Sequence, residues 1–333
     1  MNVRRRPGTS RTRTAGITAG VTSGVAAAVA LALGLGTLTG CSAADATGTR
    51  TSKFDVVASF YPMAFLAERI GGDHVHVVGL TTPGQEPHDL ELTPLQIAGI
   101  QDSDAVLYLR NLQPAVDKAV AESPVRTKID AASLTTLERH GTEVGGHAAA
   151  HDSAVGEDTA GADPHIWLDP VRYAQVASGV GKAFEKADPK HAADYRRNTA
   201  ALVRQLNALN GQFRDGLAHT RSRVFITTHA AFGYLAERYG LTEEAVSGLD
   251  PESEPSAARV RDLQRLARAD GVSTVFYETL VSDSTAKTVA GDAGLRTDVL
   301  DPLEGITDKS RGRDYFSVQR ANLKALQRAL GAR

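Results

Sequence analysis

Short apolar runs alternate with helix-like segments along this 333-residue chain, and this alternation limits the possible folds more than any other feature. It occurs twice, over residues 54–130 and again over residues 223–330. Strands separated by helices of this length pair in parallel, with the helices covering the faces of the sheet. We therefore expect an α/β fold with two parallel-sheet lobes.

The positions of the elements follow from the same pattern. In the first lobe we expect strands at 54–60, 75–80, 105–109 and 127–130, and helices at 63–70, 93–100, 113–122 and 171–187. In the second we expect strands at 223–228, 243–247, 273–277 and 297–300, and helices at 230–239, 257–269, 283–292 and 314–330.

One long amphipathic segment separates the two series. Residues 190–219 contain no Gly or Pro before Gly211, and apolar residues recur at steps of three and four: Leu202, Leu206, Leu209, Phe213 and Leu217. A helix of this length extends about 40 Å at 1.5 Å per residue. It is predicted to be a rigid strut, residues 188–219, that joins lobes at 54–187 and 220–333. An ordinary surface helix is the alternative.

The first forty residues are typical of an export signal. They contain five Arg and no acid, followed by an uncharged run that is densest in apolar residues from Val25 to Leu35. A retained membrane span is the alternative, because residues 14–44 carry no charge. Gly, Ser and Thr interrupt the run, however, so we favour a signal peptide at 1–40.

The run ends in Leu38-Thr39-Gly40-Cys41, which resembles the bacterial lipobox, whose Cys becomes the lipidated N-terminus after cleavage. Cys41 is the only cysteine, so we expect no disulfide and no thiolate ligand for a metal. Residues 41–53 are predicted to be a flexible tether from the outer face of the cell membrane. The chain from Cys41 has 32 basic and 39 acidic side chains, a net charge of −7, which argues against a nucleic-acid partner.

A segment rich in histidine, acid, Gly and Ala covers residues 138–163. It contains His140, His147 and His151 with six carboxylates, and such a composition cannot build a core. Imidazole and carboxylate are ordinary metal ligands, so we expect a mobile loop that could collect divalent cations. A disordered acidic insert without that role is the alternative.

Of four candidate metal ligands, three lie at or near predicted strand ends and one lies in a loop. His88 follows a strand in a Pro- and Gly-rich loop, His229 and Asp301 directly follow strands, and His165 lies in the loop that leads into the region between the lobes. Ligands of parallel sheets bind at the carboxyl ends of the strands. Three histidines and one carboxylate would form a tetrahedral site that suits zinc better than manganese. Singly, each histidine could be a helix cap, and Asp301 could start a turn.

Local motifs favour the metal site over these structural roles. They are Gly84-Gln85-Glu86-Pro87-His88; Asp163-Pro164-His165-Ile166-Trp167-Leu168-Asp169-Pro170; Thr228-His229-Ala230-Ala231-Phe232-Gly233-Tyr234-Leu235 with Arg238-Tyr239-Gly240-Leu241; and Val299-Leu300-Asp301-Pro302-Leu303. In order and spacing they resemble the solute-binding proteins of bacterial zinc and manganese ABC importers, the cluster A-I metal receptors.

The resemblance implies two α/β lobes joined by one long helix, a metal site in the cleft between them, and metal ligands at His88, His165, His229 and Asp301. It implies an extracytoplasmic receptor, not an enzyme, that captures Zn²⁺ and delivers it to an ABC importer permease. A zinc metallochaperone is a further candidate partner. Zinc-selective relatives have His at the third position, where many manganese receptors have Glu, so His229 indicates zinc. A manganese receptor is the alternative.

Two functions from other classes are the remaining alternatives. A zinc hydrolase needs an open coordination position, and the chain lacks His-Glu-x-x-His and Gly-x-Ser-x-Gly motifs. A surface adhesin that uses zinc only structurally should unfold without it. We also expect a monomer, little lobe closure on metal binding, and Glu86 or Glu278 orienting the imidazoles. Because ligating histidines must be neutral, affinity should fall below roughly pH 6.5.

Overall fold

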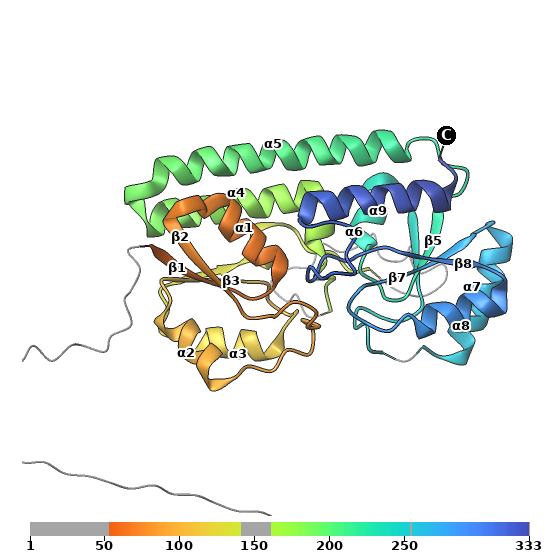
Figure 1. Cartoon of the computed structure of the whole chain (residues 1–333), viewed down its shortest axis with the longest axis horizontal. Helices are drawn as coiled ribbons and strands as arrows, with labels where there is room; N and C mark the ends of the chain where they lie inside the picture. Colours follow the sequence, from red (N-terminus) through yellow and green to blue (C-terminus); the bar gives the residue numbers. More distant parts are fainter. Residues whose placement is uncertain (1–52, 141–160, 254, 333) are drawn as a thin grey trace, which may run out of the picture. The chain divides into compact units, whose positions relative to one another are not determined.

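Two parallel β-sheets with the same strand order form the framework of the structure (Figure 1). The first sheet has the order β2-β1-β3-β4 and the second has the order β6-β5-β7-β8. The structure is a computed structural model that describes residues 53–140, 161–253 and 255–332. The two α/β lobes predicted from the alternation are confirmed.

In the first lobe the strands are β1 Phe54–Ala58, β2 Val75–Gly79, β3 Ala105–Tyr108 and β4 Thr127–Asp130, and the helices are α1 Tyr61–Gly71, α2 Pro94–Asp102, α3 Pro114–Glu122 and α4 Pro170–Ala187. In the second the strands are β5 Val224–Thr227, β6 Thr242–Ala245, β7 Thr274–Tyr277 and β8 Arg296–Val299, and the helices are α6 Gly233–Tyr239, α7 Ala257–Ala269, α8 Ser284–Ala293 and α9 Tyr315–Leu330. Helix α5, Ala192–Leu217, lies between the two series.

Most element ends agree with the sequence within a few residues, and one of the differences affects a site residue. The helix expected at 230–239 begins only at Gly233. Residues 229–232 instead form an irregular turn, in which the Ala230 N–H donates to the Gly248 carbonyl at 2.9 Å. His229 therefore lies at the start of this turn, four residues before the helix.

Alternate residues of the central strands serve two different cores. In β1, Val56 and Ala58 belong to one hydrophobic cluster and Val57 to another, which lies under α2 and α3. In β7, Phe276 joins the first cluster and Val275 joins a third, beside α7 and α8. The first cluster therefore contains residues from both sheets and continues from one lobe to the other.

Helix α5 is 26 residues long and contacts both lobes. It packs along α1 and α4 of the first lobe and along α9 of the second (Figure 1). All five apolar residues that the spacing placed on one face are buried: Leu202, Leu206, Leu209, Phe213 and Leu217. The long joining helix predicted from the sequence is confirmed.

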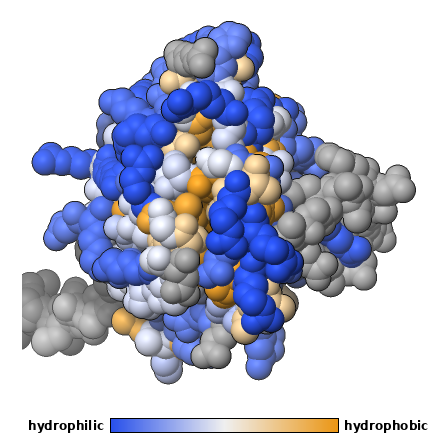
Figure 2. Space-filling model, turned by 90° about the vertical axis from the view of Figure 1, so that its right-hand side faces the viewer, coloured by the Kyte–Doolittle hydropathy of each residue, from blue (hydrophilic) through white to orange (hydrophobic). Residues whose placement is uncertain are grey.

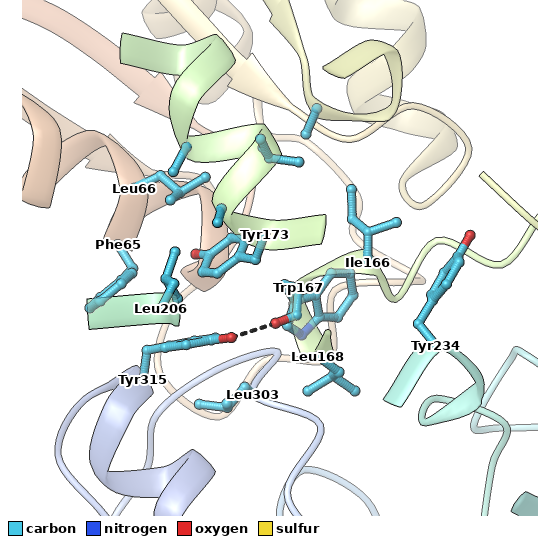
Figure 3. Packing of buried hydrophobic residues seen from close by; sticks show 14 of the residues in the cluster. Phe65, Leu66, Ile166, Trp167, Leu168, Tyr173, Leu206, Tyr234, Leu303 and Tyr315 are labelled. Carbon is cyan, nitrogen blue, oxygen red and sulfur yellow. Dashed lines mark hydrogen bonds between the residues drawn. The ribbon is translucent and has the colours of Figure 1, made fainter. Parts of the chain in front are cut away.

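The short 3-10 helix Ile166–Leu168 is anchored to the second lobe through Trp167 (Figure 3). The Trp167 indole N–H donates to the Pro302 carbonyl at 2.6 Å, and the Tyr315 hydroxyl donates to the Trp167 carbonyl at 2.7 Å. Trp167 is fully buried, and its ring meets Phe60 edge-on at 4.9 Å between centroids. These contacts fix the position of the neighbouring His165.

The outer helices of the second lobe show ordinary amphipathic packing. Helix α7 buries Leu263 and Ala267 and carries four Arg and one Asp among its other positions. Figure 2, which views the end at the right of Figure 1, shows a mostly hydrophilic face with apolar side chains between the charged ones. Within the described residues, no helix is long and apolar enough to cross a membrane.

Candidate metal centre

Loops from both lobes bring three histidines and one glutamate together. His88 lies in the loop after β2, His229 lies two residues after the end of β5, and Glu304 lies in the loop after β8. His165 is the N-cap residue of the 3-10 helix Ile166–Leu168. Their ligand atoms all lie within 4.8 Å of one another, and we call this group the inner site.

The distances within the inner site suit a tetrahedral ion. Oε1 of Glu304 lies 3.4 Å from Nε2 of His88, 3.4 Å from Nε2 of His165 and 3.8 Å from Nε2 of His229. The two Nε2 atoms of His165 and His229 are 3.4 Å apart. An ion bound at about 2.0–2.1 Å by four tetrahedral ligands separates them by roughly 3.3 Å. These four separations are thus approximately those that a tetrahedral zinc site requires.

Buried carboxylates orient two of the imidazoles. Nδ1 of His165 lies 2.8 Å from Oδ1 of Asp163, and Nδ1 of His229 lies 2.8 Å from Oε1 of Glu278. Each carboxylate accepts a hydrogen bond from the Nδ1–H, so that Nε2 is the ring nitrogen directed into the site. Of the two glutamates named from the sequence, Glu278 therefore contacts a ligand ring. Sequence reasoning did not assign Asp163 a role, although it lies in the same motif as His165.

Glu86 supports His88 in a different way. Its Oε1 accepts a hydrogen bond from the His88 backbone N–H at 2.9 Å, so it holds the loop and not the ring. Burial, reinforced by the charge of Glu304, raises the pKa of Glu86 to about 8. The His88 side chain is 12% exposed, whereas those of His165 and His229 are buried. The inner site therefore meets solvent on the His88 side.

A cavity of about 830 Å³ lies between the loop that carries His88 and the loop that carries Glu304. Its lining includes Pro83 and Gly84 of the first lobe and Thr279, Thr307 and Lys309 of the second. None of the four inner-site residues is among those that line this cavity, so it lies beside the inner site.

His165 and Glu304 shift each other's pKa in the inner site. Burial alone would lower the pKa of His165, but hydrogen bonds to Asp163 and Glu304 outweigh it and raise the pKa to about 10. Burial would likewise raise the pKa of Glu304, yet the imidazoles of His165 and His88 hold it well below its usual range. In the absence of metal, a proton on His165 thus balances the charge of Glu304.

The expectation for Asp301 is corrected by the structure. One oxygen of its carboxylate accepts from the Leu303 N–H at 2.8 Å, and the other accepts from the Thr279 hydroxyl at 3.3 Å. This is the turn that an Asp before Pro favours. Leu303 adopts a φ of 61°, which reverses the chain so that Glu304, not Asp301, faces the histidines. The adjacent sequence Leu303-Glu304 carried no signal strong enough to reveal this.

The remaining candidate residues from the sequence are His140, Cys41, His147 and His151. His140 lies beside Asp163, outside the inner site, with its Nδ1 2.6 Å from Oδ2 of Asp163. Cys41, His147 and His151 lie outside the described residues.

A family model described as "Zinc-uptake complex component A periplasmic", ZnuA, matches residues 56–329. The chain belongs to the ZnuA family. This is a family of solute-binding receptors and not of enzymes, as the sequence predicted.

Individual members of the ZnuA family resemble this chain over most of its length. The zinc-binding lipoprotein AdcA of Streptococcus pneumoniae is 34% identical over 281 residues, which cover 83% of this chain and 55% of AdcA. The high-affinity zinc uptake system protein ZnuA of Bacillus subtilis is 31% identical over 299 residues, 87% of this chain and 92% of that protein.

A solved structure from the same family also resembles this chain. The Zn(II)-bound ZnuA-like domain of Streptococcus pneumoniae AdcA has a TM-score of 0.67 at 32% identity, covering 84% of this chain and 99% of that domain. The chain thus spans about half the length of AdcA but nearly all of its ZnuA-like domain.

Proposed function

We propose that this protein captures Zn²⁺ outside the cytoplasm and delivers it to the permease of an ABC importer. The ion would be held by Nε2 of His88, His165 and His229 and by Oε1 of Glu304. The observation that carries the proposal is the spacing of these four atoms, 3.4–3.8 Å for the glutamate contacts, which matches the edges of a zinc tetrahedron.

The chemistry of the inner site favours zinc over manganese. Three imidazole nitrogens and one carboxylate suit a borderline-soft ion, whereas manganese prefers more oxygen ligands. His229, supported by Glu278, provides a nitrogen at the position where many manganese receptors have an oxygen ligand. The zinc-bound ZnuA-like domain of AdcA supports the same choice.

A hydrolase is disfavoured by the fourth ligand. Catalytic zinc keeps a coordination position open for water. Glu304 is almost completely buried and lies close to all three histidines, so it fills that position.

Export and anchoring belong to the same proposal. Cleavage before Cys41 and its lipidation would keep the protein at the outer face of the cell membrane, beside its permease. The name lipoprotein carried by the relative AdcA supports this. A Cys41→Ala variant should no longer incorporate a labelled fatty acid, and labelling of that variant equal to the wild type would contradict lipidation at Cys41. We expect a monomer, and a zinc metallochaperone is a further candidate partner.

The test of zinc capture is a competition titration of the metal-stripped protein against a chromogenic chelator, with zinc and then with manganese. We expect tight binding of zinc that His229→Ala weakens by more than the roughly 10–100-fold typical of losing a supporting partner. His76→Ala, which removes an exposed histidine on β2, is the matched control and should bind as the wild type does. Preference for manganese, or no effect of His229→Ala, would contradict the proposal.

A further inference from the structure

The turn that carries His229 is held by a buried carboxylate that is not one of the four inner-site residues. Glu243, on β6, is 3% exposed. One of its oxygens accepts from the Thr227 hydroxyl at 2.7 Å, and the other accepts from the Phe232 backbone N–H at 2.9 Å. Thr227 is the last residue of β5, and Phe232 is the N-cap residue of α6. Glu243 thus links the two ends of the turn, with His229 between them.

The backbone of this turn depends on that side chain. The N–H groups of Ala230 and Ala231 donate to backbone carbonyls at 2.9 and 3.0 Å, whereas the N–H of Phe232 donates to Glu243. Phe232 is buried, so in a variant without the carboxylate its N–H would lose an acceptor in a place that water does not reach. Buried backbone N–H groups are nearly always paired because leaving one unpaired is costly. The turn would therefore have to rearrange.

Two neighbouring strands restrain His229 in different ways. Strand β5 lies between β6 and β7 in the second sheet. Glu278, directly after β7, accepts from Nδ1 of the His229 ring at 2.8 Å. Glu243, on β6, holds the chain on either side of His229. Glu278 therefore restrains the rotation of the imidazole, whereas Glu243 restrains the position of the Cα atom from which the imidazole extends.

The adjacent Glu244 is also buried, but it has a different partner. Its carboxylate forms an ion pair with Arg259 of α7 at 3.0 Å. Successive side chains of a strand point to opposite faces of the sheet. Glu243 therefore lies on the other face of β6, toward the turn and α6. The two glutamates provide a natural comparison, because they share a strand and a low exposure but differ in what they hold.

The hydrogen bonds of Glu243 matter more than its charge. Burial raises the pKa of Glu243 to about 7, although the hydrogen bonds from Thr227 and Phe232 act against this shift. A substantial fraction of the carboxyl group is therefore uncharged near neutral pH. A neutral amide that reaches the same two partners should replace it.

We propose that Glu243 is a positioning residue for zinc capture. By holding the turn at residues 229–232, it sets the point from which His229 enters the inner site, and with it the coordination geometry of the bound ion. It acts through the backbone of the turn. This inference rests on the proposed zinc capture at the inner site.

The test compares Glu243→Gln with Glu243→Leu. The glutamine can accept from the Phe232 N–H and donate to the Thr227 hydroxyl oxygen, so we expect the zinc affinity of the wild type. The leucine loses both hydrogen bonds, and chelator competition should show an affinity lowered by roughly 10–100-fold, as for other groups that orient a metal ligand. Glu244→Leu, on the same strand but the opposite face, is the matched control and should bind zinc as the wild type does.

Bound cobalt(II) gives a readout that a purely structural role would not change. Its visible spectrum depends on the coordination geometry of the ion. We expect an altered spectrum in Glu243→Leu and the wild-type spectrum in Glu243→Gln and Glu244→Leu, with circular dichroism showing which variants are folded. A folded Glu243→Leu variant with the zinc affinity and cobalt spectrum of the wild type would overturn the inference. A Glu243→Gln variant as weak as Glu243→Leu would overturn it too.

A milder variant serves if Glu243→Leu does not fold. Thr227→Val removes one of the two hydrogen bonds and nearly keeps the shape of the side chain. We expect a smaller loss of zinc affinity together with an altered cobalt spectrum, and wild-type values for both would overturn the inference. Absence of tight zinc binding by the wild type would instead refute the proposed function.

Discussion

The carboxylate of Glu304 contacts three imidazoles, whereas that of Asp301, three residues earlier, contacts its own turn. We predict that Glu304→Gln lowers zinc affinity by more than the roughly 10–100-fold that loss of a supporting group costs, because it removes the only charged ligand. Asp301→Asn should change affinity less than about tenfold, since an Asn oxygen can still accept from the Leu303 N–H. Chelator competition on both variants measures the difference, and equal losses would refute the assignment of Glu304.

The raised pKa of His165 predicts a wide pH dependence of zinc binding. Zinc binds the neutral ring, and in the metal-free protein the ring stays protonated until the pH approaches about 10. Zinc must therefore displace a proton at neutral pH, and affinity should rise with pH by about tenfold per unit for each proton displaced. The sequence alone suggested a fall only below roughly pH 6.5.

Competition titrations at several pH values between about 6 and 9, together with proton release in weak buffer, measure this dependence. An affinity that stays constant above pH 6.5 would show that Asp163 and Glu304 do not hold a proton on His165.

At the scale of elements, the contact between α4 and α5 depends on small residues. A Cβ on Gly181 of α4 would lie 2.2 Å from Oγ1 and 3.0 Å from Cβ of Thr199 on α5. Rotation of the threonine could relieve the first contact but not the second, so the helices would have to separate. The joining helix is thus fitted closely to the first lobe.

We predict that Gly181→Ala lowers the free energy of unfolding by about 1–3 kcal/mol, as overpacking does. Gly211→Ala on α5 is the matched control. Nothing lies within 4 Å of its added Cβ, so the better helix propensity of alanine should raise stability by about 1 kcal/mol. Chemical denaturation of the metal-free variants measures both, and a stabilised Gly181→Ala would contradict the close packing.

At the scale of the whole folded unit, the lobes share one hydrophobic cluster. It contains residues of both sheets and of α4, α5 and α9, and hydrogen bonds from Trp167 and Tyr315 add polar links (Figure 3). The inner-site residues are not part of this cluster. We therefore predict that the cluster joins the lobes whether or not zinc is bound.

Removal of zinc with a chelator should accordingly leave the protein folded and change its X-ray scattering profile little. Re-addition should raise thermal stability by mass action, about 2.7 kcal/mol when free zinc is 100 times its dissociation constant. Circular dichroism and scattering, with and without chelator, test this. Unfolding would support a purely structural zinc, and greatly different profiles would indicate a wide hinge motion.

Local sequence determined the secondary structure and the lobe architecture. Strand and helix periodicities differ, Gly and Pro mark the loops, and the apolar spacing of residues 202–217 allows one buried helical face. The sequence also singled out the three histidines that the structure brings together, because each lies in a distinctive local motif. Such features depend on neighbours within a few residues, so the chain itself carries them.

Tertiary structure decided what depends on the direction of a side chain. Asp301 and Glu304 are both acids in one loop, and only the reversed backbone at Leu303 determines which of them meets the histidines. Asp163 hydrogen-bonds to both His165 and His140. The second contact forms only because His140 lies beside α6 in the folded protein. Contacts of this kind join segments that lie far apart in the sequence, and their geometry arises from the packing of the lobes.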